Sequence, residues 1–209
     1  MANKRATTWT VLAIAAGFFR GPCLVEARNG PIKVVVHVDD YAKLARAERV
    51  EVGREVERIF SAAGVRVEWL EGLERLKVDG RFRVAIIILD RTMGTRQIVA
   101  DGIGEHVLGE AIPPARRAYV FHHRVARLLF NDPGKLGQAL GAVAAHEIGH
   151  LLLPEASHSA EGIMQPHVPF NLIVPQRFTD AQSAAIRTTL AALHERSPAR
   201  LPAEARAAK

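Results

Sequence analysis

The sequence contains a single cysteine, Cys23, which excludes a small scaffold held together by disulfides. Aromatic residues make up only 6% of the chain, and no lysine and arginine cluster recurs with them, so the net charge of +6 does not indicate a nucleic-acid partner. No apolar run reaches the ~18 residues that cross a bilayer, so we expect no stable membrane insertion. With 209 residues, 48% hydrophobic and 24% charged, the composition is typical of a globular protein of about one domain.

The first 27 residues resemble a targeting segment. Lys4 and Arg5 precede a short apolar stretch from Trp9 to Phe19, and Val25-Glu26-Ala27 fits the small-residue pattern of a cleavage site. We therefore expect a signal peptide over residues 1–27 and a secreted or periplasmic location. A buried N-terminal helix is the alternative.

The order of the remaining elements favours one α/β domain over residues 28–195. Strands are expected at 32–38, 65–70, 83–89, 107–111 and 119–122, helices at 41–63, 131–153 and 179–194, and loops at 94–106 and 154–178. Small residues of the second helix, including Gly137 and Gly141, are expected to let it pack closely on the sheet. The segment 196–209 is rich in alanine, proline and charge, and we expect it to be a disordered tail.

The most informative motif is His146-Glu147-Ile148-Gly149-His150 within the second helix. Residues four apart lie on one helix face, so both imidazoles can bind one ion. Glu147 lies on the neighbouring arc and can reach a water on that ion without displacing it, which is the arrangement that metal-dependent hydrolases use.

A hydrolytic zinc site takes three protein ligands, and His158 is the candidate for the third. It lies eight residues after His150, beyond the helix-ending Pro154, where a loop can fold back. Glu155 and Glu161 are alternatives on the same loop, and Glu195 and Glu204 lie further along the chain. His167 could also reach the cleft.

The stretch from His146 to Pro166 resembles the metzincin metallopeptidases, especially the matrixin branch. The resemblance rests on the helix motif, on His158-Ser159 and on Gly162-Ile163-Met164-Gln165-Pro166, which is similar to the family's Met-turn. The sequence departs from the family pattern in two ways. The glycine expected three residues after the second histidine is Leu153, and the third histidine comes two residues late.

The resemblance implies a mostly parallel twisted sheet with an antiparallel edge strand, packed on the active-site helix and followed by a C-terminal helix. It implies that Met164 lies beneath the metal and that Leu108, Gly109, Glu110 and Ala111 pair with a peptide substrate. The expected function is an exported Zn²⁺-dependent endopeptidase, with His146, His150 and His158 as ligands and Glu147 as general base. A non-catalytic metal-binding protein and a zinc hydrolase of a non-peptide amide are the alternatives; the oligomeric state is not indicated.

Overall fold

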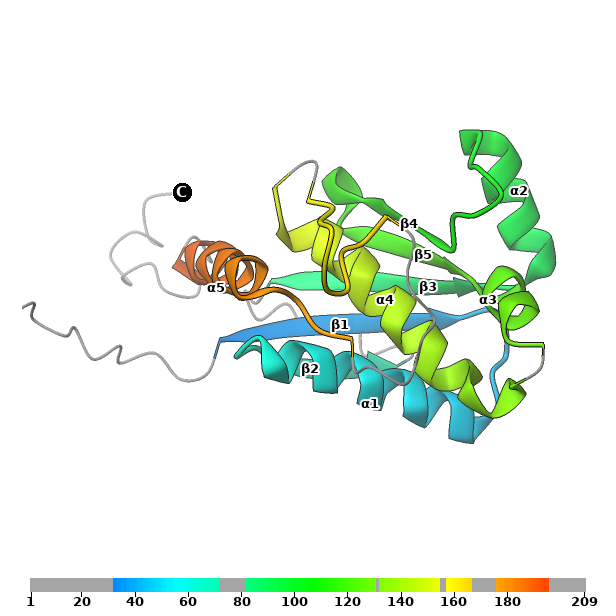
Figure 1. Cartoon of the computed structure of the whole chain (residues 1–209), viewed down its shortest axis with the longest axis horizontal. Coiled ribbons are helices and arrows are strands. Elements are labelled where there is room, and N and C mark those ends of the chain that lie inside the picture. The colour runs from blue at the N-terminus through cyan, green and yellow to red at the C-terminus, as the bar shows by residue number, and fades with distance from the viewer. Residues whose placement is uncertain (1–31, 72–81, 131, 155–156, 167–175, 196–209) are drawn as a thin grey trace, which may run out of the picture. The chain divides into compact units, whose positions relative to one another are not determined.

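Apolar runs of the chain form one five-stranded sheet with the order β2-β1-β3-β5-β4 (Figure 1). The computed structural model describes residues 32–71, 82–130, 132–154, 157–166 and 176–195, which all belong to the compact unit Pro31–Lys209. The predicted signal peptide (1–27) and tail (196–209) lie outside the described residues. The strands are β1 (Lys33–Asp40), β2 (Arg66–Glu71), β3 (Arg83–Leu89), β4 (Gly109–Ile112) and β5 (Arg117–Phe121).

The pairing confirms the predicted fold class. The four strands β2, β1, β3 and β5 are parallel to one another, and the edge strand β4 is antiparallel to β5. Strand β1 lies between two partners, and Val34, Val35 and Val36 are at most 1% exposed. Its continuous apolar sequence is therefore explained by burial on both faces of the sheet.

Two helices, α1 (Arg46–Ala62) and α4 (Leu136–Leu152), lie side by side on one face of this sheet (Figure 1). The C-terminal helix α5 (Asp180–Glu195) is also present, as predicted. Buried side chains from the sheet and the two helices form one continuous core that includes Val34, Val36, Val52, Val56, Ile59, Phe60, Leu140, Val143 and Ile148. Among the described residues, no helix is long and apolar enough to cross a membrane.

Gly137 and Gly141 of α4 face α1, not the sheet, which corrects the sequence-based expectation. A Cβ atom at Gly137 would lie 2.6 Å from Cβ of Glu51, and one at Gly141 would lie 2.7 Å from Cβ of Glu55. The absence of side chains at these two positions therefore allows the two helix backbones to approach each other. This contact fixes α4, which carries the histidine motif.

Two short helices occur where the sequence indicated other structure. Helix α2 (Arg91–Asp101) replaces the first part of the expected glycine-rich loop; Asp90 caps its start by accepting a hydrogen bond from the Met93 amide, and Gly102 ends it at a φ of 64°. Helix α3 (His122–Leu128) begins directly after β5, so His122 and His123 lie on a helix and not on a strand.

The first helix also begins later than expected, at Arg46. The carboxylate of Asp40 accepts a hydrogen bond from the Leu44 amide, so it stabilises a turn ahead of the helix and does not cap it. The N-cap residue is Ala45, whose amide donates to Oε2 of Glu48 at 2.8 Å. The glutamate in the first turn thus caps the start of the helix through the Ala45 amide.

Candidate active site

Helix α4 places the histidine motif in the interior of the protein. The residues from Gly137 to Gly149 are almost all buried, and His146 and Glu147 are only 4% and 6% exposed. The helix ends at Leu152, and Leu153 is extended, with φ of −95° and ψ of 157°. Because proline disfavours helical geometry in the residue before it, Pro154 explains this exit.

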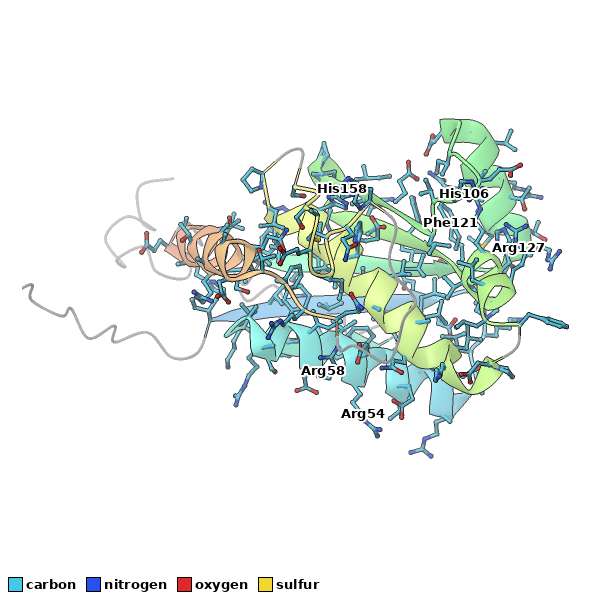
Figure 2. All side chains as sticks on the ribbon, in the orientation of Figure 1. Arg54, Arg58, His106, Phe121, Arg127 and His158 are labelled. Carbon is cyan, nitrogen blue, oxygen red and sulfur yellow. The ribbon has the colours of Figure 1, made fainter. Side chains whose placement is uncertain are left out.

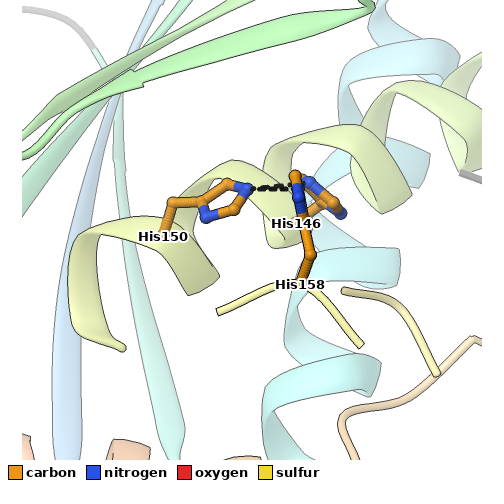
Figure 3. Close-up of side chains that lie close together, drawn as sticks. All are labelled: His146, His150 and His158. Atoms are coloured by element: carbon orange, nitrogen blue, oxygen red, sulfur yellow. Dashed lines mark hydrogen bonds between the residues drawn. The ribbon is translucent and has the colours of Figure 1, made fainter. Parts of the chain in front are cut away.

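The following loop returns to the helix and brings His158 to the histidine pair (Figure 3). Nε2 of His150 lies 3.0 Å from Nε2 of His146 and 3.1 Å from Nε2 of His158. Within the described part of the chain, these three side chains form the group whose ligand atoms lie within 4.8 Å of one another. The two additional residues in the loop therefore do not prevent the convergence.

Hydrogen bonds fix the orientation of two of the rings. Nδ1 of His146 lies 2.7 Å from the carbonyl oxygen of Ile163, which can only accept, so Nδ1 carries the proton and Nε2 presents its lone pair. Nδ1 of His150 lies 3.0 Å from Oγ of Ser157. Such contacts at the far ring nitrogen are how metal-binding histidines are commonly oriented.

The spacing of the three nitrogen atoms fits a tetrahedral ion. Zinc–nitrogen bonds of 2.0–2.1 Å in tetrahedral geometry separate two ligand nitrogens by about 3.3 Å. Nε2 of His150 lies 3.0 and 3.1 Å from the other two Nε2 atoms, and the ligand atoms of all three histidines lie within 4.8 Å of one another. One ion can therefore contact all three nitrogen atoms. A single shared proton, in contrast, could bridge only two of the three imidazoles.

Burial favours the metal-binding form of His146 and His150. Burial lowers the pKa of His146, against the opposing hydrogen bond to Ile163. Burial, with repulsion from His146 and His158, lowers the pKa of His150 to about 4. A neutral imidazole is the metal-binding form, so protons compete weakly for this site at neutral pH.

The carboxyl group of Glu147 lies in an environment that favours its protonated form. Burial raises its pKa to about 8, and the negative charge of Glu110 adds to this effect. Gly109 of β4 packs directly on this side chain, because a Cβ atom there would lie 2.7 Å from both Cγ and Oε1 of Glu147. The edge strand and the carboxyl group are thus immediate neighbours.

Met164 belongs to the segment that resembles a Met-turn, and its expected place beneath a bound metal stays a prediction. It is fully buried and packs on α4 at Gly149, where a Cβ atom would lie 2.5 Å from its sulfur. The turn begins at Gly162, whose φ is 73°, and the Ile163 amide donates to the Arg177 carbonyl oxygen at 2.8 Å. The same residue, Ile163, offers the carbonyl that orients His146.

The three histidines and Glu147 border a cleft of about 470 Å³. Strand β4 and the residues before it line the same cleft, including all four predicted substrate-binding residues, Leu108, Gly109, Glu110 and Ala111. His106, to which the sequence analysis gave no role, also lines the cleft; it precedes β4, whereas His158 follows α4 (Figure 2). Glu155 and His167, which the sequence analysis considered for this region, lie outside the described residues.

Sequence reasoning missed three contributors to the site. Ser157 orients His150, the Ile163 carbonyl orients His146, and Gln182 of α5 contacts the loop that carries His158. Only Gln182 had a sequence signal, because Thr179 and Gln182 have the spacing of a capping box. The roles of His146, Glu147, His150 and His158 in binding and catalysis remain predictions.

Comparison with known proteins adds little to this geometry. No protein-family model and no curated protein matches the chain. Among solved structures, the chain is similar to a zinc-dependent peptidase from Methanocorpusculum labreanum, with 14% sequence identity and a TM-score of 0.42. The match covers 75% of this chain and 99% of that chain. A similarity this low does not define the chemistry of the present chain.

Proposed function

We propose that this protein is a zinc-dependent endopeptidase of the matrixin-like metzincin type. The observation that carries the proposal is the convergence of three imidazole Nε2 atoms beside a buried carboxyl group, in a cleft bordered by the edge strand of the described sheet. Three nitrogen ligands with room for a fourth are the donor set of a catalytic zinc site. The ligands would be His146, His150 and His158.

The proposed chemistry combines this ion with one proton carrier. Bound zinc supplies Lewis acidity, which polarises a carbonyl group and acidifies water. Glu147 accepts a proton from the attacking water and delivers it to the leaving amine. Its pKa of about 8 comes mainly from burial, and a cation held by the histidines would lower it towards neutrality, where a carboxyl group can both accept and release a proton.

The edge strand β4 provides the means to bind an extended peptide. One of its sides pairs with β5, and the strand has no further neighbour within the described sheet. A peptide could therefore add to the sheet by backbone hydrogen bonds, largely independent of its sequence. Binding along an open edge supports cleavage within a chain, and hence an endopeptidase.

We further propose that residues 1–27 direct export of the protein, which N-terminal sequencing of the secreted form would test.

The variant Glu147→Gln tests the catalytic role separately from metal binding. It keeps the size of the side chain and all three histidines, so we expect an unchanged zinc content and a loss of peptide cleavage of about 10²–10⁴-fold. The exposed Glu57→Gln on α1 is the control and should retain activity. Activity should be measured on a peptide library with and without chelator.

The same experiment separates the alternatives. Stoichiometric zinc without cleavage of any peptide in the unaltered protein would indicate a non-catalytic metal-binding protein. Chelator-sensitive hydrolysis of small amides, but not of peptides, would indicate a different zinc hydrolase. Full peptidase activity in Glu147→Gln would show that this residue is not the general base.

A further inference from the structure

The loop that carries His158 is attached to the C-terminal helix by one side chain. Nε2 of Gln182 donates to Oγ of Ser159 at 2.9 Å and also lies 3.5 Å from the carbonyl oxygen of Ser157. These two serines flank His158 on either side. The side-chain amide of Gln182 therefore holds the backbone segment from which the third imidazole projects.

The same glutamine closes the first turn of α5. Its side-chain Oε1 accepts a hydrogen bond from the backbone amide of Thr179 at 3.0 Å, and the backbone amide of Gln182 donates to Oγ1 of Thr179 at 3.3 Å. This reciprocal pair is a capping box with glutamine at the third helical position. Gln182 thus uses its oxygen for the helix and its nitrogen for the loop, so the two roles can be separated chemically.

Helix α5 is itself fixed to the core, so it can serve as a rigid support. Ile186 and Leu190 are fully buried, and Nη1 of Arg187 donates to the carbonyl oxygen of Ala63, just after α1, at 2.8 Å. Arg58, labelled in Figure 2, donates to the carbonyl oxygen of Gln176 ahead of α5 at 2.9 Å. The position of Gln182 is therefore set by contacts that do not involve the metal site.

We infer that Gln182 is a positioning residue for the metal site: it holds His158 in place for metal binding through the Ser157–Ser159 backbone. This inference rests on the proposed function, because it concerns the same three ligands. The loop from α4 to His158 is two residues longer than in the family pattern, and a longer loop has more conformational freedom to lose when its imidazole binds an ion. Ordering the loop in advance reduces that cost.

A crossed pair of variants isolates this role. Gln182→Glu retains an acceptor for the Thr179 amide, since glutamate serves equally in a capping box, but removes the N–H donor that holds Ser159. Thr179→Ala does the reverse. It removes the hydroxyl that accepts a hydrogen bond from the backbone amide of Gln182, and it leaves the side-chain amide that holds Ser159 intact. A merely structural effect of α5 would act most strongly in Thr179→Ala.

The readouts are zinc affinity, measured by competition with a chromophoric chelator, and hydrogen exchange of segment 157–164 in the metal-free protein. We expect Gln182→Glu to bind zinc about 10–100-fold more weakly, as for other residues that orient metal ligands, and to exchange faster in this segment. Thr179→Ala should have a lower melting temperature, with zinc affinity and exchange of the segment unchanged.

Two results would overturn the inference. One is zinc affinity and exchange in Gln182→Glu equal to those of the unaltered protein; the other is an equal loss of zinc affinity in Thr179→Ala. If the unaltered protein binds no zinc, the proposed function fails and this inference fails with it. Normal zinc binding by Gln182→Glu, in contrast, refutes the inference alone.

Discussion

Alanine in place of Gly141 should destabilise the protein, whereas the same change at Gly53 should stabilise it. Both glycines lie inside helices, Gly53 in α1 and Gly141 in α4. In a helix interior, alanine is favoured over glycine by about 1 kcal/mol of free energy. The two positions differ in what a new Cβ atom would contact, so the pair separates helix packing from helix propensity.

The structure gives the expected magnitudes. At Gly53 the nearest atom to a new Cβ is Cε2 of Trp69 at 3.6 Å, an ordinary contact, so the free energy of unfolding should rise by about 0.5–1 kcal/mol. At Gly141 a new Cβ would lie 2.7 Å from Cβ of Glu55 and 2.8 Å from the carbonyl oxygen of Val52. Neither atom belongs to a mobile side-chain end, so α1 and α4 must separate by about 1 Å to restore normal contact distances. Overpacking of this kind costs about 1–3 kcal/mol, and because two close contacts occur here we take the upper end of that range. After the gain in helix propensity of about 1 kcal/mol is subtracted, the free energy of unfolding should fall by about 2 kcal/mol.

Urea unfolding of both variants at saturating zinc measures these changes, because unchanged slopes would show that only stability has altered. The difference of about 3 kcal/mol between the variants corresponds to roughly 6–12 °C in melting temperature for a protein of this size. A Gly141→Ala variant as stable as Gly53→Ala would refute the close packing of α4 on α1. It would also remove the explanation of how the histidine helix is held.

Two further predictions concern the cleft. His158→Ala should weaken zinc binding by roughly 10²-fold or more, because it removes one of three ligands, whereas His106→Ala in the same cleft should leave zinc affinity unchanged. Zinc titration of the two variants decides this, and equal losses would contradict the ligand assignment. Gly109→Ala should displace the carboxyl group of Glu147, since a Cβ atom there would lie 2.7 Å from Oε1. Peptide cleavage should fall by about 10²-fold with zinc affinity unchanged, and full turnover would show that this contact is not rigid.

The sequence predicted best what depends on local spacing. The alternating and continuous apolar runs located the five strands of the described sheet, and the four-residue separation of His146 and His150 placed both on one helix face. The glycines at 94, 102 and 104 concealed helix α2, although Asp90 and Gly102 mark its ends. Gly94 is tolerated inside this helix because the ring of His123 packs against it, with Cε1 only 3.1 Å from where a Cβ atom would lie. That contact joins two elements and could not be predicted from the local sequence.

The position of the third histidine shows why motif spacing alone cannot define a site of this kind. In the metzincin pattern that the sequence resembles, a glycine soon after the helix lets the chain turn, whereas here Leu153 leaves α4 in an extended conformation. Within the described part of the loop, the left-handed glycine conformation occurs later, at Gly162. The Ser159 amide then donates to the Met164 carbonyl oxygen at 2.9 Å, and Gln182 holds Ser159 from the other side. These contacts join residues up to 23 positions apart, so the imidazole reaches its partners through a different local path than the motif implies. What the site requires is convergence of three nitrogen atoms, and more than one loop length can provide it.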